Sequence, residues 1–154
     1  MDINPKQIIS DFIKVAFLAG VLIAEDDLSV QLLPAPHTPP TTIPYGKMAI
    51  YMFLWGDLCL KIGKAGHKSK ARFTNQHYNP ESSNSNLAKS ILKYKDQLKL
   101  ANLDDTNISE WIKKKTSRVN FYIDKKLGIF ILNLLESFLQ CRFKPFFEGF
   151  DSQR

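Results

Sequence analysis

Residues 47–62 read KMAIYMFLWGDLCLKI and contain the clearest strand signal in the chain. A Gly56-Asp57 pair between two apolar runs is typical of a β-hairpin, so we expect strands over 47–55 and 58–62. Apolar side chains fall on both faces of the first strand, with Ile50 and Met52 on one and Tyr51 and Phe53 on the other. This pattern predicts a central strand that other elements cover on both sides.

Helices are expected before and after this hairpin. The spacing of apolar residues predicts long helices over 5–24, 87–100 and 127–141, and shorter ones over 68–76 and 109–115. A third strand is expected over 119–123. These elements predict an α+β fold, with a small three-stranded and mostly antiparallel sheet flanked by helices.

A proline-rich stretch separates the start of the chain from this fold. Residues 34–44, PAPHTPPTTIP, contain five prolines and can form neither a helix nor a central strand. We therefore divide the chain into an N-terminal helical extension over 1–33, a proline-rich linker over 34–45 and a main domain over 46–150.

Length and composition favour an ordinary globular domain. The chain has 154 residues, of which 44% are hydrophobic, which excludes a wholly disordered chain and a disulfide scaffold. No apolar run reaches the roughly 18 residues that cross a bilayer, so no membrane partner is expected. Cys59 and Cys141 lie in apolar surroundings and are expected to be reduced core thiols, which indicates a cytoplasmic protein.

The net charge of +6 is concentrated in the middle of the chain. Residues 1–60 carry −3, residues 61–126 carry +9 and residues 127–154 carry 0. A basic segment of this kind favours an anionic partner, most commonly nucleic acid. The alternative is a set of solvated helix faces.

Common catalytic motifs are absent, and one constellation remains. The sequence has no metal-site spacing of His or Cys, no phosphate-binding glycine loop and no GxSxG elbow. Ala49-Ile50-Tyr51 is followed, ten residues after the tyrosine, by Lys61-Ile62-Gly63-Lys64. Arg72 lies eleven residues beyond Lys61, and Glu136 lies on the last helix. This constellation resembles the GIY-YIG nuclease superfamily over about residues 46–149.

The resemblance implies a metal-dependent DNA endonuclease, of restriction or mobile-element type, that hydrolyses phosphodiester bonds. Tyr51 would activate water, Arg72 would bind the scissile phosphate, and Glu136 would bind Mg²⁺ (or Mn²⁺). Lys61 stands where the second motif usually has tyrosine, as in some restriction endonucleases of the superfamily, and Glu148 stands at a common asparagine. A homodimer is an open option, because many enzymes that cut both strands dimerise. Further candidates for DNA contact are Lys64, Lys68, Lys70, His77 and Tyr78.

The chemistry of these residue types agrees with the resemblance. One glutamate can hold a hydrated Mg²⁺, and an arginine can grip a phosphate with two hydrogen bonds. An ammonium beside Tyr51 would lower the pKa of its phenol, and Lys61 is the candidate; His77 and Tyr78 could contact phosphate or assist the tyrosine.

Each residue also has a purely structural interpretation. Tyr51 could be a core aromatic, and Lys61 and Arg72 could be solvated. The polar stripe of Asn133, Glu136 and Gln140 is either a solvent face or the wall of a polar site. The competing function is a catalytically inactive nucleic-acid-binding module that retains the fold.

The hairpin register tests the nuclease interpretation. With a two-residue Gly56-Asp57 turn and no irregularity, Tyr51 and Lys61 would point to opposite faces of the sheet. We therefore predict a three-residue loop, Trp55-Gly56-Asp57, or an equivalent bulge, which pairs Tyr51 directly with Lys61.

Overall fold

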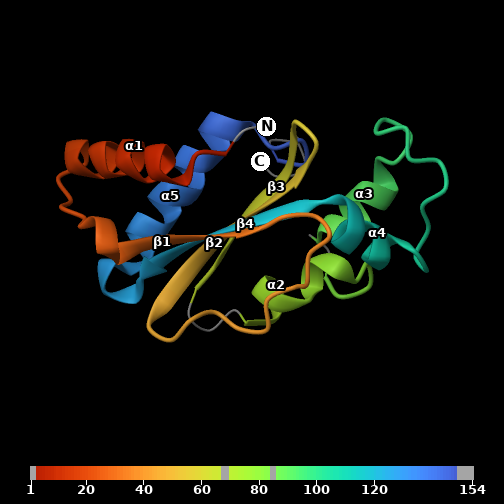
Figure 1. Cartoon of the computed structure of the whole chain (residues 1–154), viewed down its shortest axis with the longest axis horizontal. Helices are drawn as coiled ribbons and strands as arrows, with labels where there is room; N and C mark the ends of the chain where they lie inside the picture. Colours follow the sequence, from red (N-terminus) through yellow and green to blue (C-terminus); the bar gives the residue numbers. More distant parts are fainter. Residues whose placement is uncertain (1–2, 67–69, 84–85, 149–154) are drawn as a thin grey trace.

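Four antiparallel strands form one sheet in the order β1-β4-β2-β3 (Figure 1). The structure is a computed structural model and describes residues 3–66, 70–83 and 86–148. The strands are β1 (Leu28–Leu33), β2 (Lys47–Trp55), β3 (Leu58–Ala65) and β4 (Ser117–Asp124). The helices are α1 (Pro5–Leu18), α2 (Lys70–Thr74), α3 (Leu87–Lys93), α4 (Ile108–Lys115) and α5 (Gly128–Phe143), with 3-10 turns η1 (Glu25–Asp27), η2 (Gln76–Tyr78) and η3 (Lys125–Leu127). The α+β class expected from the sequence is confirmed.

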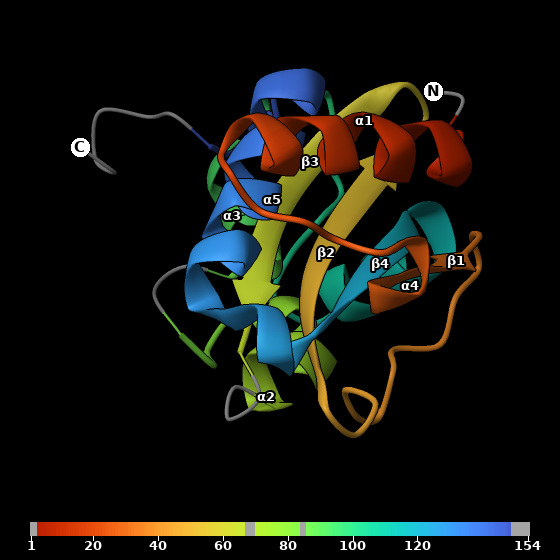
Figure 2. The same ribbon diagram turned by 90° about the vertical axis from the view of Figure 1, so that its left-hand side faces the viewer.

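Helices cover both faces of the sheet, with α1 and α5 on one side and α2, α3 and α4 on the other (Figures 1 and 2). Ile50 and Met52 of β2 belong to the buried cluster that includes α1 and α5. Tyr51 and Phe53 belong to a second buried cluster, which includes α2, α3 and α4. The strand β2 is therefore buried on both sides, as its apolar pattern predicted.

The sheet has four strands where the sequence predicted three. The additional strand, β1, pairs with β4 along its whole length, from Leu28 opposite Ile123 to Leu33 opposite Arg118. Helix α1 adds further contacts, because Phe12 is fully buried in the core cluster of its face. The segment interpreted as an N-terminal extension thus supplies an edge strand and a core helix to the same sheet.

The β2–β3 hairpin closes with a two-residue turn and contains a bulge. Trp55 pairs with Leu58 across Gly56-Asp57, where a three-residue loop was the first expectation. The register then shifts between Phe53 and Leu54. This irregularity is the bulge that was predicted as the alternative to a three-residue loop.

The bulge brings Lys61 onto the same face as Tyr51, although the two are not direct partners. Phe53 pairs with Lys61, and Tyr51 pairs with Gly63. The predicted direct pairing of Tyr51 with Lys61 was therefore wrong: the partner of Tyr51 is two residues further along β3. Because neighbours two residues apart share a face, both side chains still point to the same side of the sheet.

The segment after α5 runs back along β3. The helix ends at Phe143, and Lys144 then adopts a left-handed conformation with φ of 45°. The backbone N–H groups of Phe146 and Phe147 donate to the carbonyls of Cys59 and Leu60 at 2.8 and 3.0 Å. These bonds cover the beginning of the outer edge of β3 and bring residue 148 close to the strand.

The two cysteines differ in their surroundings. Both are free thiols, and Cys59 is buried as expected. Cys141 is exposed on α5, so the prediction that it lies in the core was wrong. Among the described helices, none has the length and apolar character needed to cross a membrane.

Candidate active site

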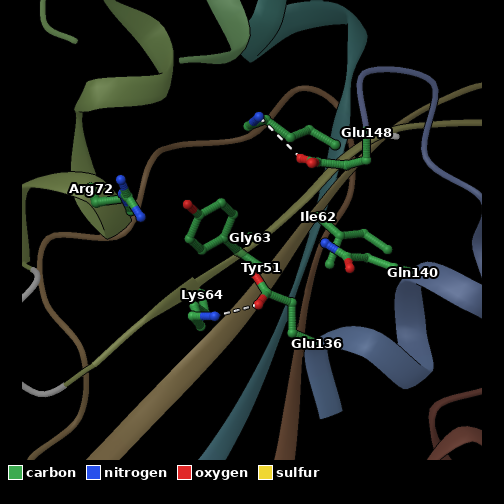
Figure 3. A pocket seen from close by; sticks show the side chains of 9 residues that line it. Tyr51, Ile62, Gly63, Lys64, Arg72, Glu136, Gln140 and Glu148 are labelled. Atoms are coloured by element: carbon green, nitrogen blue, oxygen red, sulfur yellow. Dashed lines mark hydrogen bonds and ion pairs between the residues drawn. The ribbon is translucent and has the colours of Figure 1, made fainter. Parts of the chain in front are cut away.

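A pocket of about 180 Å³ lies along β3, the terminal strand of the sheet (Figure 3). Its lining includes the four residues that the sequence singled out as catalytic, namely Tyr51, Lys61, Arg72 and Glu136. The remaining lining residues are Ile62, Gly63, Lys64, Gln140 and Glu148. The fold therefore brings the predicted catalytic set together from β2, β3, α2 and α5.

Side chains from both faces of the sheet meet in this pocket. Tyr51 belongs to the face covered by α2, whereas Glu136 lies on α5, which covers the opposite face. They can share one pocket because β3 is the terminal strand of the sheet, with no further strand beside it in the described part of the chain. Gly63 contributes by its lack of a side chain, since an added Cβ would lie 2.5 Å from Tyr51 Oη.

The hydroxyl of Tyr51 is hydrogen-bonded to His77. Tyr51 is 1% exposed and His77 2%, and the distance from His77 Nε2 to Tyr51 Oη is 2.7 Å. The backbone N–H of Leu87, at the first residue of α3, donates to His77 Nδ1 at 3.2 Å. Burial, helped by the charges of Lys61, Arg118 and Arg72, lowers the pKa of His77 to about 3, so the ring is neutral at physiological pH.

These contacts define the direction of the hydrogen bond. A neutral imidazole carries one proton, and Nδ1 of His77 is already an acceptor. The proton therefore resides on Nε2, which donates to Tyr51 Oη. His77 accordingly places a donor against the tyrosine oxygen and leaves the phenolic proton of Tyr51 for another acceptor.

The pKa of Tyr51 is shifted upward, not downward as predicted from Lys61. Burial raises this pKa, and the positive charges of Arg72 and Arg118 oppose the rise. Glu136 and Glu148 raise it further. The cations that favour a phenolate at Tyr51 are therefore two arginines, one of which the sequence analysis did not identify.

Lys61 is held by a carboxylate. Its Nζ lies 3.1 Å from Glu148 Oε1, and Lys61 is only 5% exposed. The bulge turns Lys61 toward the pocket, and the chain reversal after α5 delivers Glu148 to it. The predicted pairing of Lys61 with Tyr51 is thus replaced by an ion pair at the edge of the same pocket.

Glu136 forms the second ion pair of the pocket. Its Oε2 lies 2.7 Å from Lys64 Nζ, and its side chain is 17% exposed. Gln140, one turn further along α5, also lines the pocket. The polar stripe of α5 is therefore the wall of a polar site at these two positions, not a solvent face.

Arg72 is exposed at the pocket rim on α2. Within the described parts of the chain, it has no carboxylate in ion-pair distance, in contrast to Lys61 and Lys64. A guanidinium without a counter-ion, at the edge of a pocket, is well placed for a phosphate.

The pocket contains oxygen groups of the kind that divalent cations bind. Glu136 and Glu148 supply carboxylate oxygens to one pocket, and Gln140 supplies an amide oxygen. Mg²⁺ prefers oxygen ligands and typically uses one or two carboxylates while keeping several waters. The described residues contain no cluster of three or more His, Cys, Asp or Glu that could hold a metal ion.

The other predicted DNA contacts have different locations. Lys64 lies in the pocket, Lys70 is exposed at the start of α2, and Lys68 falls outside the described residues. His77 and Tyr78 are buried, at 2% and 5% exposure, so their prediction as DNA-contacting residues is corrected. The alternative that His77 assists the tyrosine agrees with its hydrogen bond.

Two contributors were missed by the sequence analysis. Gly63 makes room for the ring of Tyr51, and a glycine inside a strand is a known sign of close approach. Arg118 is fully buried with its guanidinium 5.3 Å from the centre of the Tyr51 ring. In the sequence, Arg118 could have been noticed as a charged residue directly before the strand expected over 119–123.

Comparisons with protein-family models, curated proteins and solved structures find no match to this chain.

Proposed function

We propose that this protein is a divalent-metal-dependent DNA endonuclease of GIY-YIG type, which hydrolyses phosphodiester bonds in the pocket along β3. The observation that carries the proposal is the convergence of Tyr51, Arg72 and Glu136 from three separate elements on one small polar pocket. A tyrosine can activate water, an arginine with no ion pair among the described residues can bind phosphate, and a carboxylate can hold a metal ion.

Tyr51 is the proposed general base. Its raised pKa makes the phenolate a strong base, although little of it is ionised at neutral pH. The donated hydrogen bond from His77 Nε2 stabilises negative charge on the oxygen as the proton leaves. The positive charges of Arg72 and Arg118 also favour the phenolate form of Tyr51.

Arg72 is the proposed phosphate ligand, since its guanidinium has no carboxylate to release first among the described residues. Glu136 is the proposed metal ligand, and Lys64 would give up its ion pair with Glu136 when the site is loaded. A bound Mg²⁺ or Mn²⁺ would supply positive charge for the phosphoryl and leaving oxygens. The +9 charge of residues 61–126 supports DNA as the substrate.

A non-catalytic nucleic-acid-binding module is the second candidate. The specific observation in its favour is that both pocket carboxylates are engaged by lysines, Glu136 by Lys64 and Glu148 by Lys61. A pocket closed by its own ion pairs would bind DNA through its remaining positive charges without cutting it.

A plasmid nicking assay, with and without Mg²⁺, separates the two candidates. We expect the unmodified protein to nick supercoiled DNA only when the metal is present, and Glu136→Gln to abolish nicking while DNA binding persists. Glu110→Gln, at an exposed glutamate of α4, is the matched control and should nick normally. Binding without nicking by the unmodified protein would favour the non-catalytic module, and full activity of Glu136→Gln would remove Glu136 from the site.

A further inference from the structure

Arg118 of β4 is the largest fully buried side chain of the described structure. It has no carboxylate in ion-pair distance among the described residues, although it lies within a few ångströms of the pocket tyrosine. A buried guanidinium normally requires a counter-ion, because removing its charge from water is costly. Arg118 is therefore a buried cation that has no anionic partner among the residues the structure describes.

Neutral groups satisfy this guanidinium. Nε donates to Asn120 Oδ1 at 2.8 Å, and Nη2 donates to the carbonyl of Phe73 at 2.7 Å. Nη1 donates to Tyr78 Oη at 3.2 Å, and the distance from that hydroxyl to His37 Nε2 is 2.8 Å. These hydrogen bonds fix the guanidinium in place, and none of the three acceptors carries a charge.

Aromatic rings surround the same group. Its central carbon lies 4.6 Å from the centre of the Phe73 ring, 5.1 Å from Phe53 and 5.3 Å from Tyr51. The negative faces of these rings attract the cation. Of the three rings, only that of Tyr51 can take up a full negative charge.

We propose that Arg118 is a positioning residue of the pocket, whose buried charge stabilises negative charge on the oxygen of Tyr51 and whose bond to Phe73 fixes the helix that carries Arg72. The counter-charge of Arg118 is thus the phenolate that forms during the reaction. The inference deepens the proposed function, and its catalytic meaning rests on that function.

Other charged and titratable groups also face Tyr51. His77 donates to its oxygen from η2, and Arg72 approaches from α2. The negative charges of Glu136 on α5 and of Glu148 disfavour a phenolate at Tyr51. Lys61 lies on β3 and forms an ion pair with Glu148. The test must therefore change Arg118 alone and observe Tyr51 alone.

The test is a titration of position 51 without DNA or metal. A fluorinated tyrosine, whose phenol ionises at lower pH, is incorporated at position 51 and followed by ¹⁹F NMR. We expect Arg118→Met to raise the ionisation midpoint by at least about one pH unit, a tenfold change in the ionisation constant. Arg142→Met is the matched control, because Arg142 is an exposed arginine that pairs with Asp11, and it should leave the midpoint unchanged.

Arg118→Lys answers the same question if Arg118→Met does not fold. The ammonium keeps the charge and loses most of the hydrogen bonds, so the midpoint should stay within about half a unit of the unmodified protein. A folded Arg118→Met with an unchanged midpoint, or a tenfold change in Arg118→Lys, would overturn the inference. Because the titration needs no cleavage, an inactive protein with the expected shift would refute the nuclease and leave the role of Arg118 intact.

Discussion

Tyr51 occupies the space in which residue 63 would carry a side chain. A Cβ built on Gly63 would lie 2.5 Å from Tyr51 Oη and 2.7 Å from Cζ, distances that real Cβ atoms do not show. The Tyr51 ring is buried, and its hydroxyl is anchored by His77, so it has little freedom to move aside. Tyr51 can therefore occupy this position only because residue 63 is a glycine.

Gly63→Ala should displace the tyrosine and destabilise the fold. We expect a loss of about 1–3 kcal/mol in the free energy of unfolding, as in other overpacked cores, together with loss of nicking. Gly66→Ala is the matched control, because an added Cβ at Gly66 meets no atom within 4 Å. Denaturant unfolding and the nicking assay measure both effects, and equal behaviour of the two variants would contradict the close approach.

His77 should make the protein less stable in acid. Burial lowers its pKa to about 3, whereas the unfolded chain titrates near its ordinary value of about 6.5. Between these values the unfolded state binds one more proton, so the free energy of unfolding falls as pH decreases, by up to about 1.4 kcal/mol per pH unit. His77→Gln lacks this proton, and its urea-derived stability should depend less steeply on pH between 6 and about 4. Parallel curves for the two proteins would show that His77 is not held neutral.

The ion pair between Lys61 and Glu148 should be worth more than an exposed one. Lys61 is almost fully buried, so the pair is poorly screened by solvent. A double-mutant cycle with Lys61→Met and Glu148→Gln should give a coupling energy of about 1–3 kcal/mol in urea unfolding. The same cycle on Lys113 and Glu110, a pair on the surface of α4, should give about 0.2–1 kcal/mol. A coupling no larger than the surface value would mean that the pocket pair is solvated.

Arg72 should matter for DNA and not for folding. With no ion-pair partner among the described residues, its replacement by Met should change the free energy of unfolding by less than about 0.5 kcal/mol. The same change should weaken DNA binding. It should also reduce the slope of log affinity against log salt concentration by about one, the value for one lost phosphate contact. Arg72→Lys should recover part of the binding and little of the cleavage, since an ammonium cannot grip phosphate with two bonds. Lys89→Met, at an exposed lysine of α3, is the control, and an equal loss of affinity there would indicate nonspecific charge.

Local patterns predicted the hairpin and the last helix. Gly56-Asp57 between apolar runs marked the position of the hairpin, although its turn has two residues where three were expected, and the apolar spacing of 127–141 corresponds to α5. The strand β1 was missed because its pairing with β4 depends on a partner far along the chain. Leu28, Val30 and Leu32 alternate as in a strand, but the segment is short and leads directly into the proline-rich stretch, so its local pattern alone is weak.

The residues that line the candidate site could be predicted from the sequence, but the contacts between them could not. The resemblance to GIY-YIG nucleases implied Tyr51, Lys61, Arg72 and Glu136, all of which line the pocket. The partners of these residues depend on strand order and chain reversal, which single-sequence patterns do not contain. The ion pair of Lys61 with Glu148 requires the segment after α5 to return along β3, and the bond of His77 to Tyr51 requires the N-terminus of α3 behind the imidazole.

The position of β4 in the sheet also sets the order of events during synthesis. It lies between β1 and β2 and is the last of the four strands to be translated. The β2–β3 hairpin can form on the ribosome, but the pairing of β1 with β4 must wait until residues 117–124 have left the exit tunnel. The pocket needs Glu136 and Glu148 as well, so a nascent chain carries no complete site while it is still short of residue 148.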